Sequence, residues 1–134
     1  MNIERRHRIL LVDDHALVRK GLRTLLQQHA DIEVIGDAAN GQEALEKVEM
    51  LDPDLVVMDL SMPVMDGIAA TKVMTAQYPR VAVIGLSSQS ADEAAASMKS
   101  AGARDYILKD KAGDDLYDAI VSTLATPRSA ASAS

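Results

Sequence analysis

The sequence predicts an α/β protein in which a parallel β-sheet is covered by helices on both faces. Short apolar runs alternate with segments of helical periodicity five times along the 134-residue chain. Such alternation with short loops is typical of βα units. The run Leu55–Met58 is apolar throughout, as expected for a strand that is buried on both faces. Right-handed crossovers between successive strands then leave few topologies.

The first two βα units are expected within residues 8–51. Strands are predicted at Arg8–Val12 and Glu33–Gly36. A helix near His15–Gln28 is indicated by residues at helical spacing, namely Leu17, Val18, Gly21, Leu22, Leu25 and Leu26. A second helix is predicted near Gln42–Leu51, with one apolar face made by Ala44, Leu45 and Val48.

The other three units follow the same pattern. Strands are predicted at Leu55–Met58, Val81–Leu86 and Asp105–Leu108, and helices at about Gly67–Gln77, Ser90–Ser100 and Gly113–Leu124. Tyr78 precedes a proline and should end the third helix, because that position disfavours the helical region. Gly102 is the expected stop of the fourth helix. The methionines at positions 58, 62, 65, 74 and 98 are interpreted as core filler rather than metal ligands.

Length and composition indicate one domain at residues 1–125, followed by a disordered linker or tail at 126–134, which is small, polar and aperiodic. No apolar run approaches the ~18 residues of a membrane span. The polar N-terminus is not typical of a secretory signal. The absence of cysteine excludes disulfide and thiolate chemistry, and fits a cytoplasmic location.

The charge pattern disfavours direct binding to nucleic acid. The net charge is −6, and the basic residues are scattered apart from the run at positions 5–8. Nucleic-acid binding needs a clustered positive footprint. The chain also has no Trp and no Phe, so it offers few stacking surfaces for single strands.

Polar residues stand where four of the predicted strands end, and together they indicate a phosphoryl-accepting site. These residues are Asp13 and Asp14, Asp59, Ser87 and Lys109. Ligands of parallel sheets bind outside the carboxyl ends of the strands. Three crowded carboxylates repel one another unless a cation offsets them, and a hard divalent ion such as Mg²⁺ suits oxygen ligands. Lys109 would offset part of the charge, and the Ser87 hydroxyl could hydrogen-bond a phosphoryl oxygen.

Each residue taken alone has a simpler interpretation. Asp14 could cap the first helix, Ser87 could open a loop, and Lys109 could be a solvated lysine. No oriented base is evident that would make Ser87 a hydrolytic nucleophile, since His15 is the only nearby candidate. His15 itself is interpreted as an N-terminal helix residue, not as a metal ligand.

The chain resembles the receiver domain of two-component response regulators. The matching segments, in order, are Ile9–His15, Pro53–Gly67, Leu86–Ser88, Ala101–Ala103 and Tyr106–Lys109. The resemblance covers about residues 6–125, and is greatest to receivers with helix-turn-helix output domains or to C-terminal receivers of hybrid histidine kinases. It implies a flavodoxin-like (βα)5 three-layer sandwich with the strand order 2-1-3-4-5.

The resemblance also implies residue roles. Asp59 would accept a phosphoryl group from a histidine kinase or phosphotransfer protein. Asp14 and Asp59 would bind Mg²⁺ directly, the Ser61 carbonyl would add an oxygen, and Asp13 would act through water. Lys109 would pair with Asp59 and then with the phosphoryl group. Ser87 and Tyr106 would form a switch that alters the surface of the fourth helix, fifth strand and fifth helix to control an output domain or a partner, and this surface could form a homodimer.

Two departures from the family pattern are visible. Asp110 follows Lys109, where many receivers have a proline in a cis peptide. A cis bond without proline costs about 3 kcal/mol, so a cis peptide is not assigned here. Ser87 stands where threonine is commoner, which removes a methyl group but keeps the hydroxyl.

Two other functions use related α/β sheets. An aspartyl-phosphate phosphohydrolase would carry a second acid two residues after its nucleophile, where this chain has Ser61. A flavin-binding module would need a phosphate loop after the first strand, where the charges of Asp13 and Asp14 would repel the phosphate. The chain is therefore expected to be a signalling domain that catalyses only its own phosphorylation and dephosphorylation, not an enzyme for an external substrate.

Overall fold

The computed structural model describes residues 6–60, 66–87 and 92–125, and its fold agrees with the predicted class. The elements alternate along the chain as β1 (His7–Val12), α1 (Ala16–Gln27), β2 (Ile32–Ala38), α2 (Gly41–Leu51), β3 (Leu55–Asp59), α3 (Gly67–Gln77), β4 (Ala82–Ser87), α4 (Asp92–Ala101), β5 (Asp105–Leu108) and α5 (Ala112–Ala125). All strand pairs are parallel, in the order β2-β1-β3-β4-β5. The predicted order 2-1-3-4-5 is therefore confirmed.

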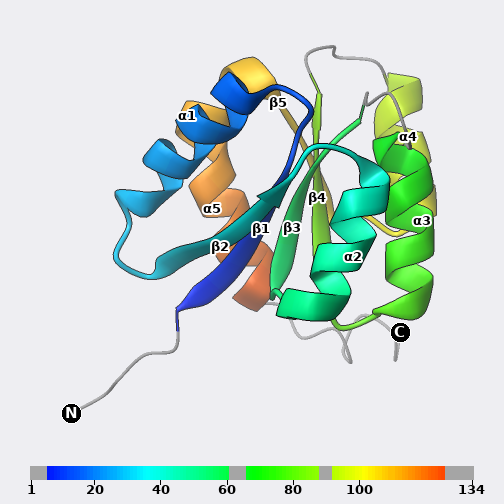
Figure 1. The fold of residues 1–134 in the computed structure, drawn as a ribbon. Helices are drawn as coiled ribbons and strands as arrows, with labels where there is room; N and C mark the ends of the chain where they lie inside the picture. The colour runs from blue at the N-terminus through cyan, green and yellow to red at the C-terminus, as the bar shows by residue number, and fades with distance from the viewer. Residues whose placement is uncertain (1–5, 61–65, 88–91, 126–134) are drawn as a thin grey trace.

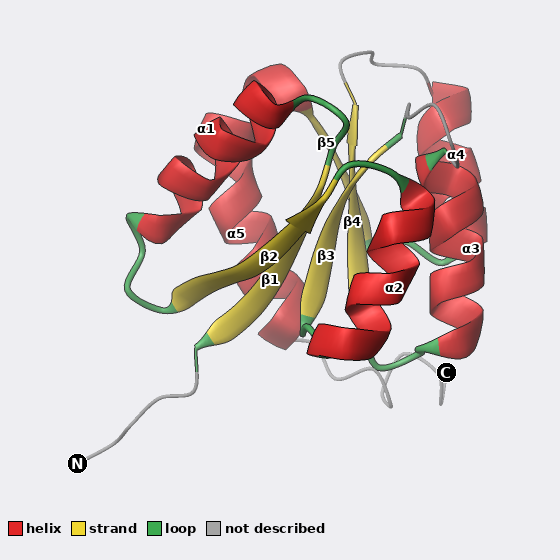
Figure 2. Cartoon of the chain, viewed as in Figure 1, coloured by secondary structure: helices red, strands yellow, loops and turns green. Residues whose placement is uncertain are grey.

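The sheet lies between two helical layers, with α1 and α5 on one face and α2, α3 and α4 on the other (Figures 1 and 2). Alternate residues of each central strand contribute to different layers of the core. In β1, Ile9 and Leu11 pack toward the layer of α1 and α5, while Leu10 and Val12 pack toward the other. This two-sided burial explains why β3 is apolar at four successive positions before Asp59.

Element boundaries differ from the predictions by a few residues. Strand β2, for example, extends to Ala38 because it pairs with β1 as far as Val12. Both β3 and β4 include the polar residue that ends them, Asp59 and Ser87. A short 3-10 turn at Lys109–Lys111 precedes α5. No cis peptide bond occurs in the described segments, so the peptide after Lys109 is trans.

Local capping explains where several helices begin and end. The Asn40 side chain accepts a hydrogen bond from the Glu43 backbone, and Glu43 accepts one from the Ala39 backbone, which is a reciprocal cap of α2. Gly102 has a φ of 110°, a conformation that glycine adopts without steric cost. This confirms Gly102 as the end of α4.

One residue of the predicted apolar stripe in α1 points away from the core. Leu17 is 80% exposed, whereas Leu22 and Leu26 are buried. Only a narrow stripe of α1 packs against the sheet, and Leu17 lies outside that stripe. Helical spacing alone predicts Leu17 in the core. Met58, Met74 and Met98 are fully buried, as predicted, while Met62 and Met65 lie outside the described residues.

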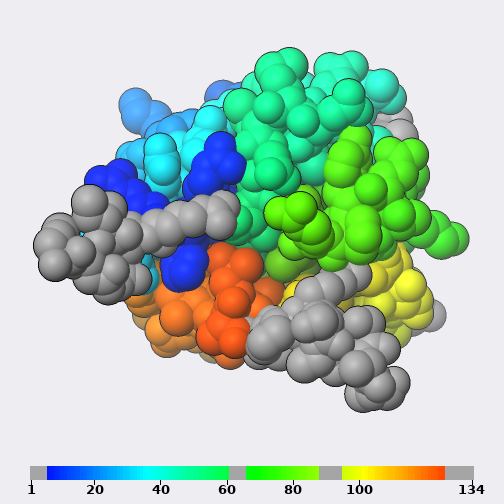
Figure 3. All heavy atoms as spheres, turned by 90° about the horizontal axis from the view of Figure 1, so that it is seen from below, coloured from blue at the N-terminus to red at the C-terminus, as the bar shows by residue number. Residues whose placement is uncertain are grey.

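Figure 3 shows the molecule from below, at the side where the strands begin. In this view the start of β1 lies beside α5. A shallow pocket of about 300 Å³ at this end is lined by Arg6, His7, Asp54, Arg80 and Leu124. It is at the opposite end of the strands from the predicted site. None of the helices in the described ranges is long and apolar enough to cross a bilayer. Residues 126–134, predicted to be a linker or tail, lie outside the described residues.

Candidate functional site

The carboxyl ends of β1, β3 and β5 bring two carboxylates and an ammonium together. Asp13 follows β1, Asp59 ends β3, and Lys109 follows β5. Lys109 Nζ lies 2.8 Å from Asp13 Oδ2 and 3.2 Å from Asp59 Oδ1. Both aspartates are almost fully buried, with exposed fractions of 1% and 3%. The lysine is therefore the cation that compensates two buried negative charges in this structure.

The environment of Lys109 favours its charged form. Burial by itself lowers the pKa of this lysine, but its hydrogen bond to Asp13 and the charge of Asp59 act in the opposite direction. The net result is a pKa raised above the ordinary lysine value. Lys109 thus remains protonated at neutral pH, as a group that neutralises anionic oxygens must.

Asp13 is held through all of its polar groups. Its backbone N–H donates to the Ala38 carbonyl at 3.0 Å, and its own carbonyl accepts from Arg19 Nη1 at 2.6 Å. One carboxylate oxygen accepts from the His15 backbone N–H at 2.9 Å, and the other contacts Lys109. The backbone of Asp13 is therefore held by β2 and α1, and its carboxylate by the His15 backbone and Lys109.

Asp14 is more open and does not cap α1. The residue at the N-cap is His15, without a side-chain capping bond, so the capping interpretation of Asp14 is wrong. Asp14 has 27% of its side chain exposed, and His15 Nδ1 lies 3.0 Å from its Oδ1. That oxygen is buried and accepts no hydrogen bond among the described residues. A buried carboxylate oxygen without a hydrogen-bond partner is a suitable ligand for a cation.

The donor set at this end of the sheet fits a divalent cation. Ligand atoms of Asp13, Asp14 and His15 lie within 4.8 Å of one another. Asp59 is not in that group and is connected to Asp13 through Lys109. The carboxylates are hard oxygen ligands of the kind Mg²⁺ prefers. Proximity of the His15 ring to both carboxylates was not expected from the sequence, and Ser61, the remaining predicted ligand, lies outside the described residues.

The two predicted switch residues lie on adjacent strands. Ser87 is buried at the end of β4, opposite Leu108 of β5. Tyr106 is half-buried in β5 and opposite Gly85 of β4. A Cβ atom at Gly85 would lie 3.5 Å from Tyr106 Cδ1 and 2.7 Å from Met98 Cε. The absence of a side chain at Gly85 therefore leaves the space in which Tyr106 and Met98 of α4 pack.

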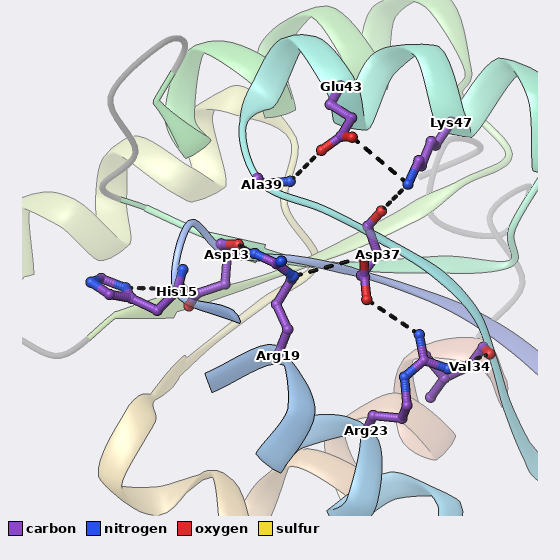
Figure 4. A network of polar contacts seen from close by, with 9 residues as sticks. All are labelled: Asp13, His15, Arg19, Arg23, Val34, Asp37, Ala39, Glu43 and Lys47. Carbon is purple, nitrogen blue, oxygen red and sulfur yellow. Dashed lines mark hydrogen bonds and ion pairs between the residues drawn. The ribbon is translucent and has the colours of Figure 1, made fainter. Parts of the chain in front are cut away.

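Sequence reasoning missed a network beside the site that Figure 4 shows between α1, β2 and α2. Arg19 lies between the Asp13 carbonyl and the Asp37 carboxylate, with its Nε 3.7 Å from Asp37 Oδ1. Arg23 Nη2 lies 3.3 Å from Asp37 Oδ2, and Lys47 donates to the Asp37 carbonyl. No signal in the sequence distinguished Arg19 from a solvated helical arginine, because its partners are on other elements.

Comparison with known proteins identifies what the chain resembles. The sequence model of the response regulator receiver domain matches residues 9–121. The chain is 49% identical over 109 residues to the uncharacterized transcriptional regulatory protein YhcZ of Bacillus subtilis, covering 81% of this chain and 51% of that protein. It is 40% identical over 116 residues to the response regulator protein VraR of Staphylococcus aureus, covering 87% of this chain and 56% of that protein.

The fold has close solved counterparts. The response regulator domain of Thermotoga maritima CheB superposes with a TM-score of 0.85 at 31% identity, covering 92% of this chain and 99% of that domain. The chain spans about half the length of the curated relatives it matches.

Proposed function

Because the chain belongs to the response regulator receiver family of two-component signalling, we propose that Asp59 is its phosphoryl acceptor and that Mg²⁺ is its cofactor. The observation that carries this proposal is the placement of Lys109 Nζ between the buried carboxylates of Asp13 and Asp59. Asp59 ends the central strand β3, at the edge of the sheet where ligands of such folds bind. The phosphohydrolase alternative is not favoured, since the family assignment accounts for the same carboxylates.

Asp59 would act as the nucleophile. A carboxylate oxygen forms a bond to phosphorus while the bond from phosphorus to the donor's imidazole nitrogen breaks, and the phosphoryl group moves to the aspartate. A carboxylate is a weak nucleophile, so the rate depends on alignment and on neutralising charge at the phosphoryl oxygens. Lys109, which contacts Asp59, would exchange this contact for one with a phosphoryl oxygen.

Mg²⁺, when bound, supplies further neutralisation of those oxygens. We assign Asp14 and Asp59 as direct ligands, with the Ser61 carbonyl, and Asp13 as a ligand through water. The burial of Asp13 and its contact with Lys109 support an indirect role, because that carboxylate is already paired. The greater exposure of Asp14, 27% of its side chain against 1% for Asp13, supports direct binding.

The signal would leave the site through Ser87 and Tyr106. A phosphoryl group on Asp59 adds charge and acceptor oxygens, and the Ser87 hydroxyl can donate to one of them. Movement of Ser87 would free space beside β5 for Tyr106. Because Tyr106 packs beside Gly85 and Met98 of α4, the surface made by α4, β5 and α5 would change, altering a homodimer or a partner contact.

The domain is proposed to work in the cytoplasm and to receive its phosphoryl group from a histidine kinase or phosphotransfer protein. Its relatives include proteins described as transcriptional regulators that are about twice as long. We therefore propose residues 1–125 as the receiver unit of a regulator and residues 126–134 as a linker or tail. This unit would catalyse only its own phosphorylation and dephosphorylation, and would not contact nucleic acid itself.

Phosphoryl labelling of matched variants tests the assignment of Asp59. Incubation with Mg²⁺ and an acyl phosphate should add one phosphoryl mass to the wild type and none to Asp59→Asn. Asp66→Asn is the matched control. The Asp66 side chain caps α3 by accepting a hydrogen bond from the Ala69 backbone N–H, and an asparagine side chain can accept the same bond. Equal labelling of Asp59→Asn would contradict the assignment. Continuous turnover of added phosphate esters, in place of one stable phosphoryl group, would favour the phosphohydrolase.

A further inference from the structure

We propose that Arg19 is a positioning residue for the metal site, because it fixes the peptide that joins Asp13 to Asp14. This inference rests on the proposed function, since it concerns the Mg²⁺ ligands named there. Arg19 lies in the first turns of α1, and 19% of its side chain is exposed. Its guanidinium donates to the Asp13 carbonyl at 2.6 Å.

The carbonyl that Arg19 binds controls the direction of the chain at Asp14. The Asp13 carbonyl belongs to the planar peptide unit that ends at the Asp14 Cα atom. A rotation of this plane would move the point from which the Asp14 side chain leaves the backbone. The Asp13 N–H, in the preceding peptide unit, is bound to the Ala38 carbonyl, so hydrogen bonds hold the peptide units on both sides of the Asp13 Cα atom.

Arg19 also faces a carboxylate of β2, although its buried Nε has no hydrogen-bond partner among the described residues. Its Nε lies 3.7 Å from Asp37 Oδ1, and the Asp37 carbonyl accepts a hydrogen bond from Lys47 of α2. Figure 4 shows Arg19 extending from α1 between Asp13 and Asp37. The planar guanidinium can contact a carbonyl and a carboxylate together, which the single ammonium of a lysine does less well.

Arg23 provides a matched control from the same helix. It also pairs with Asp37, through Nη2 to Oδ2 at 3.3 Å, but its other hydrogen bond goes to the Val34 carbonyl. Arg23 therefore shares the charge, the helix and the Asp37 partner of Arg19, but its backbone hydrogen bond goes to Val34 and not to Asp13. Arg19→Met and Arg23→Met retain much of the apolar stem and remove the guanidinium in each case.

The direction of the change in Mg²⁺ affinity distinguishes a positioning role of Arg19 from a simple effect of its charge. Removal of a positive charge near three carboxylates should by itself tighten Mg²⁺ binding, because repulsion of the cation falls. Loss of a positioning contact should weaken it, and substitutions of residues that orient metal ligands typically cost about 10–100-fold in affinity. We expect a Kd for Mg²⁺ raised about tenfold in Arg19→Met, and a change below about twofold in Arg23→Met, which leaves the ligands in place.

Mg²⁺ affinity is measured from the dependence of thermal unfolding on Mg²⁺ concentration, in the full chain. Labelling by acyl phosphate is followed in parallel. Saturating Mg²⁺ should restore the labelling rate of Arg19→Met, because the hydrogen bond and ion pair of Arg19 among the described residues go to Asp13 and Asp37, not to Asp59. The Mg²⁺ affinity of Arg19→Lys should lie between those of wild type and Arg19→Met. If Arg19→Met does not fold, Arg19→Lys is compared with wild type in its place.

Three results would overturn the positioning role: unchanged or tighter Mg²⁺ binding in Arg19→Met, equal weakening in both methionine variants, or a labelling rate that saturating Mg²⁺ does not restore. If wild type itself neither binds Mg²⁺ nor is labelled, the proposed function fails before the role of Arg19 is reached. If wild type binds Mg²⁺ and is labelled, and Arg19→Met has the same Mg²⁺ affinity and labelling rate, only the positioning role of Arg19 is rejected.

Discussion

Gly67 lies directly against the backbone of Asp59, the proposed phosphoryl acceptor. A Cβ atom at Gly67 would overlap the Asp59 carbonyl oxygen and lie 2.8 Å from the carbonyl carbon. The Gly67 N–H donates to the Leu60 carbonyl at 2.8 Å, so the start of α3 is bound to the end of β3. Only a residue without a side chain permits this approach, and the position of Asp59 depends on it.

We therefore expect Gly67→Ala to be destabilising and Gly21→Ala to be tolerated. Relief of the overlap requires movement of backbone at Asp59, and forcing atoms into filled space costs about 1–3 kcal/mol or more. Gly21 is an exposed residue in α1, and a Cβ atom there meets nothing within 4 Å. Alanine in place of this helical glycine should add about 0.5–1 kcal/mol of stability. Chemical denaturation of both variants measures the difference, and equal stabilities would contradict the close approach.

Mg²⁺ should stabilise the folded protein, because it binds only where the native state assembles the carboxylates. A concentration one hundred times Kd adds about 2.7 kcal/mol. Asp14→Ala should lose most of this gain by removing a direct ligand. Asp115→Ala, which removes an exposed carboxylate from α5, should keep it. Thermal unfolding with and without millimolar Mg²⁺ is the measurement, and a wild type insensitive to Mg²⁺ would argue against the site.

The contribution of Lys109 to stability should disappear at alkaline pH. The pKa of Lys109 is raised in the folded protein, so its stabilising effect is complete below the unfolded value and is lost as the pH rises through the folded value. We expect the difference in unfolding free energy between wild type and Lys109→Met to be constant from neutral pH to about pH 10.4, the ordinary lysine pKa. Above that it should shrink. A difference that falls at neutral pH instead would mean that the lysine is not paired as described.

A phosphoryl mimic should produce changes that reach α4. With beryllofluoride and Mg²⁺, amide signals are expected to shift at Tyr106 and in α4 as well as near Asp14 and Asp59. Gly85→Ala should reduce the shifts at Tyr106, since a methyl group would occupy space beside Tyr106 and Met98. The shifts near the carboxylates should persist in that variant. If wild-type shifts stay confined to the loops around the carboxylates, no switch accompanies binding.

The sequence by itself determined the layers of the fold and the chemistry of the candidate site. Runs such as Leu55–Met58 are apolar at every position because both faces of the sheet are covered, and this pattern depends only on local geometry. In a parallel sheet the strands all end at one edge, so Asp13, Asp59 and Lys109 were expected together from their positions at strand ends. Boundaries were less accurate, as β2 shows, because its last residues are held by pairing with β1.

Only the tertiary structure decided how those residues differ from one another. It buries Asp13 beside Lys109 while leaving Asp14 partly open, although the two are adjacent and identical in type. It also turns Leu17 outward and aims Arg19 at the Asp13 carbonyl. These outcomes depend on contacts between elements and on the orientation of each helix against the sheet, and helical spacing carries no information about either.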